Sequence, residues 1–434
     1  MSEIDKYPTA SIVMAFSACI CVTVSFVMLV AGEADLLYGF LMIALFSLIL
    51  ALVAKRRINV TRELAIAYFL RLGICLLYTV QNDGDADGYA VNALHYAAMP
   101  MDELFLNIPT GAYLYSWIIS FFFRVFGAYY MPVRAMNMAV SVWCVIITVD
   151  IASLLYDKKR IVKITALCMA LFPNLIRFSS YFANREPLLL LFTLLYIKYS
   201  YKYYASNRKR NLLLSIVFLV PAMILHTSMI AMMALTMMII MTRTSNNRNK
   251  VSVLLGKTFL LVVIVTAFAY MLLNGIGTEK FGVAGGVELS ISGISAIGNM
   301  SAAGRAAYLS GVSFSNPILT ILFLPVRMVY FLYTPFVWMV RSIVDILGLF
   351  DAVLYIWLSI IMCKKIKIVL SNKHKTKQEK FIIFMFLVLI VMIAMFGAVT
   401  SNYGTAIRHR CKLFPLFLLI SADNINIPFK IKSR

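Results

Sequence analysis

Long apolar runs recur along the whole chain, separated by short segments rich in Lys and Arg. A membrane-spanning helix needs about 20 apolar residues, and most of the runs approach that length. They predict spans near 9–31, 35–54, 62–80, 131–156, 161–182, 187–204, 211–226, 228–242, 252–274, 340–363, 381–400 and 408–425. We therefore expect an all-α, polytopic bundle of about twelve spans, forming one integral membrane domain over residues 1–434.

The basic segments predict the orientation of this bundle. Lys and Arg are enriched in cytoplasmic loops of membrane proteins. The clusters assigned to that side lie at 55–57, 157–160, 208–210, 243–250, 364–380 and 430–434. Loop 81–111, by contrast, contains no Lys or Arg and holds five acidic residues. The pattern predicts cytoplasmic termini and two longer non-cytoplasmic loops, at about 81–111 and 275–316.

Each of these loops is followed by an apolar segment. In both places the chain between the loop and the next basic cluster is too short for extra crossings. About 45 residues separate loop 81–111 from the cluster at 157–160, whereas three crossings need roughly 55 to 60. We therefore predict one crossing there and an interfacial or re-entrant segment at 112–127. Prolines interrupt the matching segment after the second loop, so 317–335 is also predicted to be re-entrant.

Composition changes the interpretation of the high net charge. The chain is 62% hydrophobic and 14% charged, which is typical of membrane proteins. Its net charge of +21 is then explained by basic loops, and a nucleic-acid partner is not expected. The seven cysteines form no CxxC pair, so neither a disulfide framework nor a thiolate metal site is predicted.

The acidic loop supplies the first candidate for chemistry. A helix starting near Asp85 would place Asp85, Tyr89, Asn92 and Tyr96 on one stripe. A carboxylate beside the membrane can deprotonate a sugar hydroxyl. No cofactor is predicted, although Asp85 and Asp87 have the ligand type that a divalent cation prefers. The alternative is that these acids only solvate a loop.

Two further candidates fall where predicted spans turn on the same side. Arg185 and Glu186 precede Pro187, which suits the first position of a helix. Charged residues at such a depth are costly unless they serve a purpose, although an ion pair fixing the helix start is the alternative. His226 lies where the chain must turn back between two cytoplasmic clusters. It is a candidate proton acceptor, or else a packing residue.

Arginines on the non-cytoplasmic side form the fourth candidate group. The arginines are Arg305, Arg327, Arg408 and Arg410. Tyr308 follows the first of them, and His409 lies between the last two. A guanidinium binds phosphate through two parallel hydrogen bonds, so a lipid-linked phosphate or diphosphate is the expected ligand. The alternative is that these side chains extend to lipid headgroups.

The first of these motifs resemble GT-C glycosyltransferases. They are Asp85-x-x-x-Tyr89-x-x-x-Ala93, Pro109-x-Gly-Ala-Tyr-Leu-Tyr, Phe126-Gly127 before Arg134, and Asn184-Arg-Glu-Pro187. In that fold an Asp of the first long outer loop acts at the acceptor hydroxyl or a metal. The chain departs from the family because Arg-Glu replaces the usual second Asp.

The remaining motifs are similar to those of Wzy/EpsG-type polysaccharide repeat-unit polymerases. They are His226-Thr-Ser, Gly304-Arg-Ala-Ala-Tyr308, Pro325-Val-Arg327, Pro335-Phe-Val-Trp338 and Asn402-Tyr-Gly-Thr-x-x-Arg408-His-Arg410. The resemblance implies polymerisation of undecaprenyl-diphosphate-linked repeat units of O-antigen or capsule in a bacterial inner membrane. It also implies membrane lipids, a chain-length regulator and a flippase as partners.

The residue pattern and the resemblance together predict roles for individual side chains. Asp85, Glu186 and His226 are the candidate bases. The candidate substrate-binding residues are Asp87, Tyr89, Arg185, Arg305, Tyr308, Arg327, Arg408, His409 and Arg410. One alternative function is a GT-C transferase that adds a single sugar from a polyprenyl-phosphate donor. Another is a transporter or flippase of lipid-linked glycan, which would require ionisable residues in the middle of the membrane.

Overall fold

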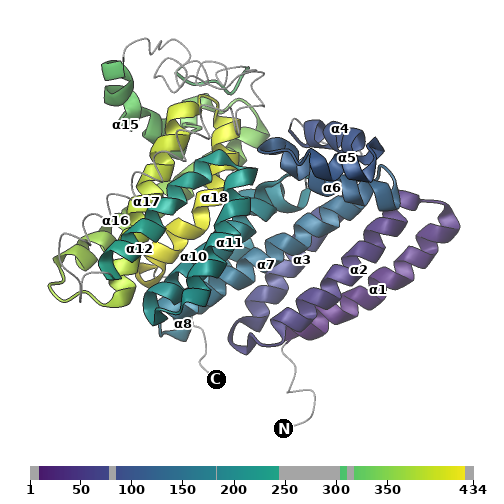
Figure 1. Ribbon diagram of the computed structural model, residues 1–434, viewed down its shortest axis with the longest axis horizontal. Helices are drawn as coiled ribbons and strands as arrows, with labels where there is room; N and C mark the ends of the chain where they lie inside the picture. The colour runs from purple at the N-terminus through teal and green to yellow at the C-terminus, as the bar shows by residue number, and fades with distance from the viewer. Residues whose placement is uncertain (1–8, 78–84, 182, 244–303, 310–316, 426–434) are drawn as a thin grey trace, which may run out of the picture.

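The computed structural model describes residues 9–77, 85–181, 183–243, 304–309 and 317–425. Within these ranges the regular elements are helices, and the one β-bridge joins Ala307 to Asn402. The all-α prediction is therefore confirmed. Figure 1 shows the long helices side by side, with shorter helices gathered at the upper end. The upper and lower ends are named here as they appear in that view.

Three helices form the N-terminal edge of the bundle (Figure 1). They are α1 (Thr9–Ala31), α2 (Ala34–Ala54) and α3 (Thr61–Leu76). The amide of Ala10 donates to Thr61 Oγ1 at 2.7 Å, so α1 and α3 begin at the same, lower end. The buried Tyr68 hydroxyl joins all three helices, because it lies 2.7 Å from Ser17 Oγ and 2.6 Å from Ser47 Oγ. The spans predicted at 9–31 and 35–54 match α1 and α2.

Three shorter helices lie across the upper end of the bundle. They are α4 (Asp85–Ala98), α5 (Met101–Leu106) and α6 (Ala112–Phe126). The next long helix, α7 (Met131–Leu155), starts beside the start of α2, where the Met131 amide donates to Asp35 Oδ1 at 2.9 Å. Since α3 rises to the upper end and α7 descends from it, α4 to α6 do not cross. The prediction that 112–127 adds no crossing is confirmed.

The middle of the chain packs around α7, which is almost entirely buried. Its elements are α8 (Lys159–Leu171), α9 (Pro173–Ile176), η3 (Arg177–Tyr181), α10 (Glu186–Ser206), α11 (Lys209–Leu225), η4 (Thr227–Met232) and α12 (Met233–Arg243). The predicted span 161–182 is bent by 58° at Phe172, whose backbone is extended before Pro173. A short 3-10 helix likewise opens the span predicted at 228–242.

The C-terminal part contains a second segment that does not cross. Its elements are α15 (Pro317–Tyr333), η7 (Val337–Met339), α16 (Ile343–Ser371), α17 (Lys377–Val399), α18 (Tyr403–Ser421) and η8 (Ala422–Asn424). Arg305 precedes α15, and Asp345 lies in the first turn of α16, yet their side chains form an ion pair of 2.6 Å. Both flanks of α15 therefore lie at the same end, and the prediction that 317–335 adds no crossing is confirmed.

Helix α18 begins earlier than predicted. The apolar run predicts a span at 408–425, whereas the helix starts at Tyr403. The side chain of Asn402 caps it by accepting from the amides of Gly404 and Thr405, at 2.8 and 3.3 Å. This start is polar, so hydropathy alone misses it. As a result Arg408 lies inside the helix rather than at its first residue.

Several helices meet the length and hydropathy expected of a membrane span. In the described ranges α1, α2, α7, α16 and α17 do so, and the bent pair of α8 and α9 adds a sixth. Helices α3 and α11 have 16 and 17 residues, slightly fewer than the roughly 20 that a span needs. The span predicted at 252–274 lies outside the described residues. These helices confirm a polytopic membrane protein.

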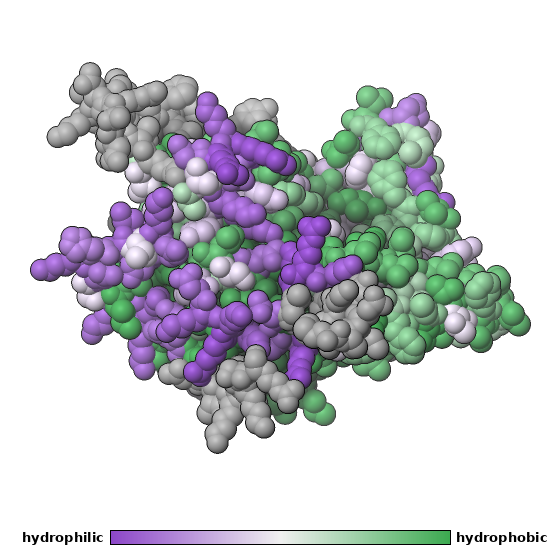
Figure 2. Space-filling model, turned by 90° about the horizontal axis from the view of Figure 1, so that it is seen from below, coloured by the Kyte–Doolittle hydropathy of each residue, from purple (hydrophilic) through white to green (hydrophobic). Residues whose placement is uncertain are grey.

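The two ends of the bundle differ in polarity. Figure 2, which views the molecule from below, shows a mostly hydrophilic underside over the C-terminal half of the bundle. Basic side chains of this end include the exposed Arg56, Lys158, Lys159 and Arg160. The arrangement agrees with the predicted clustering of Lys and Arg at one end. That this end faces the cytoplasm stays a prediction.

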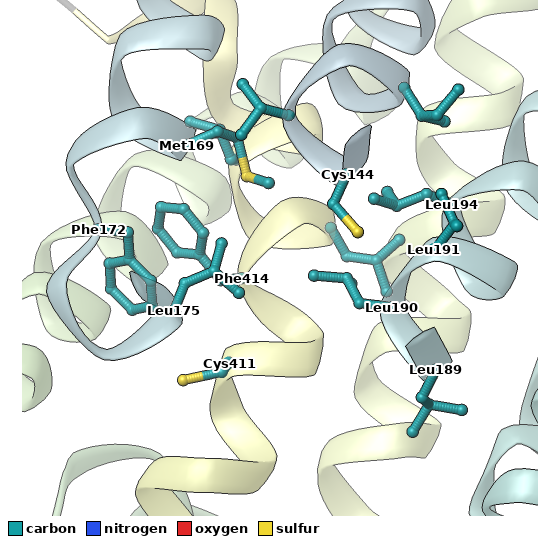
Figure 3. Close-up of a cluster of buried hydrophobic side chains, with 14 of the residues drawn as sticks. Cys144, Met169, Phe172, Leu175, Leu189, Leu190, Leu191, Leu194, Cys411 and Phe414 are labelled. Carbon is teal, nitrogen blue, oxygen red and sulfur yellow. The ribbon is translucent and has the colours of Figure 1, made fainter. Parts of the chain in front are cut away.

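An apolar cluster in the middle of the bundle holds α7, α8, α9, α10 and α18 together. Figure 3 shows Cys144, Leu190, Cys411 and Phe414 pointing into this cluster. The rings of Phe172 and Phe414 stack, with centroids 3.8 Å apart and planes 3° from parallel. Phe172 occupies the break between α8 and α9, so the bend is packed rather than open. This core supports the charged groups described next.

Candidate active site

Charged side chains from three distant parts of the chain meet inside the upper part of the bundle. Arg408 of α18 forms ion pairs with Asp85 of α4 and with Glu186 of α10. Its Nε atom lies 3.3 Å from Glu186 Oε1, and its Nη1 atom donates to Asp85 Oδ2. Asp85 and Arg408 are separated by 323 positions in sequence. The two predicted carboxylates and one predicted arginine are thus in direct contact.

Helix starts position both carboxylates. Helix α4 begins at Asp85, as predicted, and α10 begins with Glu186 followed by Pro187. The first turn of a helix favours a negative charge, because its free amide groups create a partial positive charge. Proline fits there because it has no amide hydrogen to leave unsatisfied. Each carboxylate is therefore held at a position that its local sequence stabilises.

A lysine that the sequence analysis did not select completes the cluster. Lys412 lies four residues after Arg408 and therefore on the same face of α18. Its Nζ atom lies 3.7 Å from Glu186 Oε1 and 2.8 Å from His409 Nδ1. Only 4% of Glu186 is exposed and 3% of Lys412, so both charges are removed from water. A small cavity of about 10 Å³ beside them holds one water at most, not a sugar.

His226 lies next to this cluster. Its ring centroid is 5.4 Å from that of His409 and 5.5 Å from that of Phe396. Its Nδ1 atom is 2.7 Å from the hydroxyl of Ser228, two residues along. Arg185 Nη1 donates to the carbonyl of Leu225 at 2.7 Å, which ties the start of α10 to the end of α11. The structure thereby brings the third candidate base to the same region.

Tyrosine and asparagine side chains support the site from the α4 side. The rings of Tyr89 and Tyr115 meet edge to face, with centroids 5.3 Å apart. The Tyr115 hydroxyl accepts from Asn137 Nδ2 at 3.0 Å, and the same amide group donates to the carbonyl of Asn184 at 2.7 Å. Residues 184–186 are therefore positioned through α6 and α7.

The hydroxyl of Tyr89 is an unused group in this arrangement. It is buried and has no hydrogen-bond partner among the described residues. Burial raises the pKa of Tyr89 to about 12, so the hydroxyl keeps its proton at neutral pH. It interacts electrostatically with Asp85, Arg185, Glu186 and Arg408, which places it close to the charged cluster. A buried donor without a partner is costly, and a substrate oxygen would satisfy it.

Asp87 does not join the cluster. Its side chain is exposed, whereas Asp85 turns toward Arg408. No group of three or more His, Cys, Asp or Glu side chains with the geometry of a metal site occurs in the described ranges. Asp83 lies outside them. A divalent cation at Asp85 and Asp87 therefore stays a prediction.

Arg305 and Tyr308 belong to a second group at the upper end. The Arg305 guanidinium is about half exposed and pairs with Asp345 at 2.6 Å. The Asp345 carboxylate, which also accepts from the Tyr403 hydroxyl at 3.0 Å, raises the pKa of Arg305. The Tyr308 hydroxyl donates to the carbonyl of Thr400 at 2.9 Å and is buried. Of Arg305 and Tyr308, only Arg305 has its polar group at the surface.

Arg327 and Arg410 hold helices together. Arg327 is buried and donates to the carbonyl of Ala398 and the hydroxyl of Ser401, at 2.7 and 2.8 Å. Arg410 is fully buried, lies 2.8 Å from Asp351, and donates to the carbonyls of Phe331 and Leu332. Both side chains therefore tie α15 to its neighbours. The structure does not bring either of them to Asp85, and we assign them no part in the proposal below.

Ionisable residues also occur deep in the bundle. Arg71 is fully buried and donates to Ser141 Oγ at 2.7 Å, to the carbonyls of Met169 and Ala170 in α8, and to the carbonyl of Ala67 in its own helix. Together with the pair of Asp351 and Arg410, it shows that buried charges also lie outside the cluster around Arg408. Lys412, Asp351 and Asp345 were detectable in principle, because charged residues inside apolar runs are rare.

A family model described as dolichyl-phosphate-mannose-protein mannosyltransferase matches residues 110–277. The matched segment is therefore similar to membrane glycosyltransferases of the GT-C type. No curated protein and no solved structure matches the chain. The matched segment includes Glu186 and His226 but neither Asp85 nor Arg408, so the charged cluster combines matched and unmatched parts of the chain.

Proposed function

We propose that the protein transfers a glycosyl group from a polyprenyl-phosphate-linked donor to a sugar hydroxyl. The observation that carries this proposal is the contact of Arg408 with both Asp85 and Glu186. The reaction needs a cation for the phosphate that leaves and a base for the hydroxyl that attacks. The cluster supplies both within one group of side chains, of which Glu186 is buried and Asp85 and Arg408 are partly buried.

Arg408 is assigned to the leaving phosphate. A guanidinium in a site with little water stabilises a developing negative charge strongly. It is already paired with two carboxylates, so the donor phosphate would replace Asp85 as its partner. Lys412 lies on the same helix face and would add a second positive charge near the phosphate.

Asp85 is assigned to the acceptor. Once the phosphate has taken its place on Arg408, the carboxylate would accept the proton of the attacking hydroxyl. The bond between the anomeric carbon and the phosphate oxygen breaks, and the phosphate leaves with the electron pair. The acceptor oxygen forms the new bond to that carbon. Glu186 stays with Arg408 and Lys412 and holds the cations in position.

Polymerisation of lipid-linked repeat units is the more specific form of this proposal. The order of the motifs around His226, Arg305 and Arg408 supports it, as does the exposed guanidinium of Arg305 at the upper end. In this form the substrate is an undecaprenyl-diphosphate oligosaccharide at the outer face of a bacterial inner membrane. A flippase and a chain-length regulator would act beside it.

Transfer of a single sugar is the competing form. The matching family is named for a donor with one phosphate and one mannose, and that name supports this form. The number of nearby cations supports it too. Arg408, Lys412 and Arg185 lie around the cluster, whereas Arg327 and Arg410 are bonded elsewhere. A small number of cations near the cluster suits one phosphate better than two.

Analysis of lipid-linked glycans in a deletion strain tests the proposal and separates its two forms. Accumulated complete single repeats indicate a polymerase, and truncated repeats indicate a transferase. Complementation with Asp85→Asn or Arg408→Ala should lower product formation by roughly two to three orders of magnitude. The control is Asp87→Asn, which removes an exposed carboxylate of the same helix and should leave activity nearly unchanged. Normal glycan from Asp85→Asn and Arg408→Ala would overturn the proposal.

A further inference from the structure

A pocket at the lower end of the bundle is not used by the proposed reaction. It has a volume of about 630 Å³ and lies between the ends of α2 and α7 and the start of α8. Asp150 on its wall follows Asn137 by 13 residues of α7, which corresponds to about 20 Å along the helix. The pocket therefore lies well away from the cluster around Arg408.

Cations dominate the charged groups of this pocket. Arg56, Arg57 and Lys159 line it, together with the carboxylates of Asp150 and Asp157. A fourth cation, Lys198, lies directly behind, with its Nζ atom 2.7 Å from Asp150 Oδ2. The pocket thus has an excess of positive charge.

The carboxylate of Asp150 fixes part of this positive charge in place. Arg57 donates to it through both Nε and Nη2, at 3.2 and 2.8 Å, and to the carbonyl of Val53 at 2.7 Å. These bonds hold the guanidinium of Arg57 rigidly at the pocket wall. One carboxylate shared by two cations leaves a net positive charge that is partly shielded from water. Such a charge attracts an anion more strongly than a fully hydrated one does.

The remaining lining is suited to a ligand with both a charged and an apolar part. Val60, Val149 and Val162 line the pocket beside the charged residues. Helix α8 starts at Lys159 without a side-chain cap, so the partial positive charge of its first turn adds to that of the side chains. Arg56 and Lys159 are exposed and free to close over a ligand without loss of a described ion pair.

We propose that this pocket binds a phosphate group, as carried by an anionic phospholipid headgroup or by a soluble phosphate compound. Basic pockets between helices at a membrane surface are suited to such headgroups. Arg56 and Lys159 would bind the phosphate oxygens directly, and Arg57 would complete the site from the wall. Asp157 would oppose binding through its negative charge. The site is independent of the proposed glycosyl transfer.

Binding to the purified full-length protein in a neutral detergent tests this proposal. The probes are short-chain phosphatidylglycerol, inorganic phosphate and the corresponding diacylglycerol without phosphate. A Lys or Arg near an anionic lipid surface strengthens binding to that surface about fivefold. The double variant Arg56→Ala/Lys159→Ala should therefore bind phosphatidylglycerol at least tenfold more weakly. The matched control Arg210→Ala/Lys367→Ala removes two exposed cations of the same end and should stay within twofold of the unchanged protein.

A variant with the opposite sign guards against a merely structural effect. Asp157→Asn removes an exposed carboxylate from the pocket and should tighten binding several-fold. Stronger binding of phosphatidylglycerol than of inorganic phosphate supports a lipid headgroup, and equal binding supports a soluble phosphate compound. Equal binding of the phosphate-free lipid would overturn the proposal. So would unchanged affinity in Arg56→Ala/Lys159→Ala, or weaker binding in Asp157→Asn.

Discussion

At the scale of single residues, the hydroxyl of Tyr89 allows a role in substrate binding to be tested separately from a role in stability. It is buried beside the charged cluster without a partner among the described residues. The ring of Tyr115 packs against that of Tyr89, but the hydroxyl of Tyr115 is hydrogen-bonded to Asn137. Two neighbouring tyrosines thus differ in one respect that mutation can test. The first would serve the substrate and the second the fold.

We predict that Tyr89→Phe lowers turnover by about tenfold without lowering the thermal unfolding midpoint. Loss of one hydrogen bond to the substrate accounts for about 1.4 kcal/mol. Removal of a buried hydroxyl without a partner should not destabilise the protein. Tyr115→Phe is the matched control and should lower the midpoint, because Asn137 loses a partner. A stability loss in Tyr89→Phe as large as in Tyr115→Phe would contradict the assignment.

At the scale of helices, two ion pairs illustrate how burial decides what a charge contributes. The pair of Arg410 and Asp351 joins α18 to α16 with both side chains almost fully buried. The pair of Arg305 and Asp345 lies at the upper end, with the guanidinium half exposed. Removing one partner of a buried pair leaves an uncompensated charge. Asp345 is itself only 3% exposed, but it also accepts from Tyr403, Ser342 and the Arg341 amide, so its carboxylate keeps these donors when Arg305 is removed.

Asp351→Ala should therefore destabilise the protein by about 3–5 kcal/mol, because Arg410 is left buried and charged. The double variant Asp351→Leu/Arg410→Met should recover part of the loss. Arg305→Ala should change the unfolding midpoint little. Thermal unfolding in detergent measures all three. An Asp351→Ala variant as stable as Arg305→Ala would show that the buried pair does not hold these helices together.

Hydropathy and charge predicted much of the helix arrangement, and they failed where tertiary contacts decide. Helices α1 and α2 match their predicted spans, and counting crossings predicted that α6 and α15 do not cross. The bend at Phe172 was missed because the apolar run continues through Pro173. The start of α18 was missed because its first residues are polar and depend on the cap from Asn402.

The site was predictable residue by residue but not as an assembly. Asp85, Glu186 and Arg408 were selected separately, since charge beside apolar runs is unusual. Nothing local predicts that Arg408 contacts both carboxylates, because the contact joins residues up to 323 positions apart. Equally, nothing local shows that Arg410, two residues further on, bonds Asp351 instead. The direction of a side chain from a helix is set by packing.

At the scale of the whole molecule, the arrangement of the helices fixes which residues share a membrane face. Asp87 and Arg341 are exposed near the upper end, on α4 and just before α16. Lys158 and Lys373 are exposed next to the lower ends of α8 and α16. The orientation predicted from the sequence places the first two residues on the non-cytoplasmic side of the membrane and the last two on the cytoplasmic side.

Labelling of single cysteines tests this orientation. In a cysteine-free background, Asp87→Cys and Arg341→Cys should react with a membrane-impermeant maleimide in intact spheroplasts. Lys158→Cys and Lys373→Cys should react only after the membrane is permeabilised. The reverse pattern would keep the fold but invert the predicted orientation. Reaction of Asp87→Cys and Arg341→Cys from opposite sides would contradict the fold itself.

The position of Arg408 between two carboxylates has a consequence for how related chains diverge. Loss of any one of Asp85, Glu186 and Arg408 leaves an unbalanced charge in a buried place, so each single replacement is disfavoured while the other two remain. The three positions should consequently drift together. Among homologues we expect them to be retained as a set or exchanged as a set, which appears in an alignment as covariation across almost the full length of the gene.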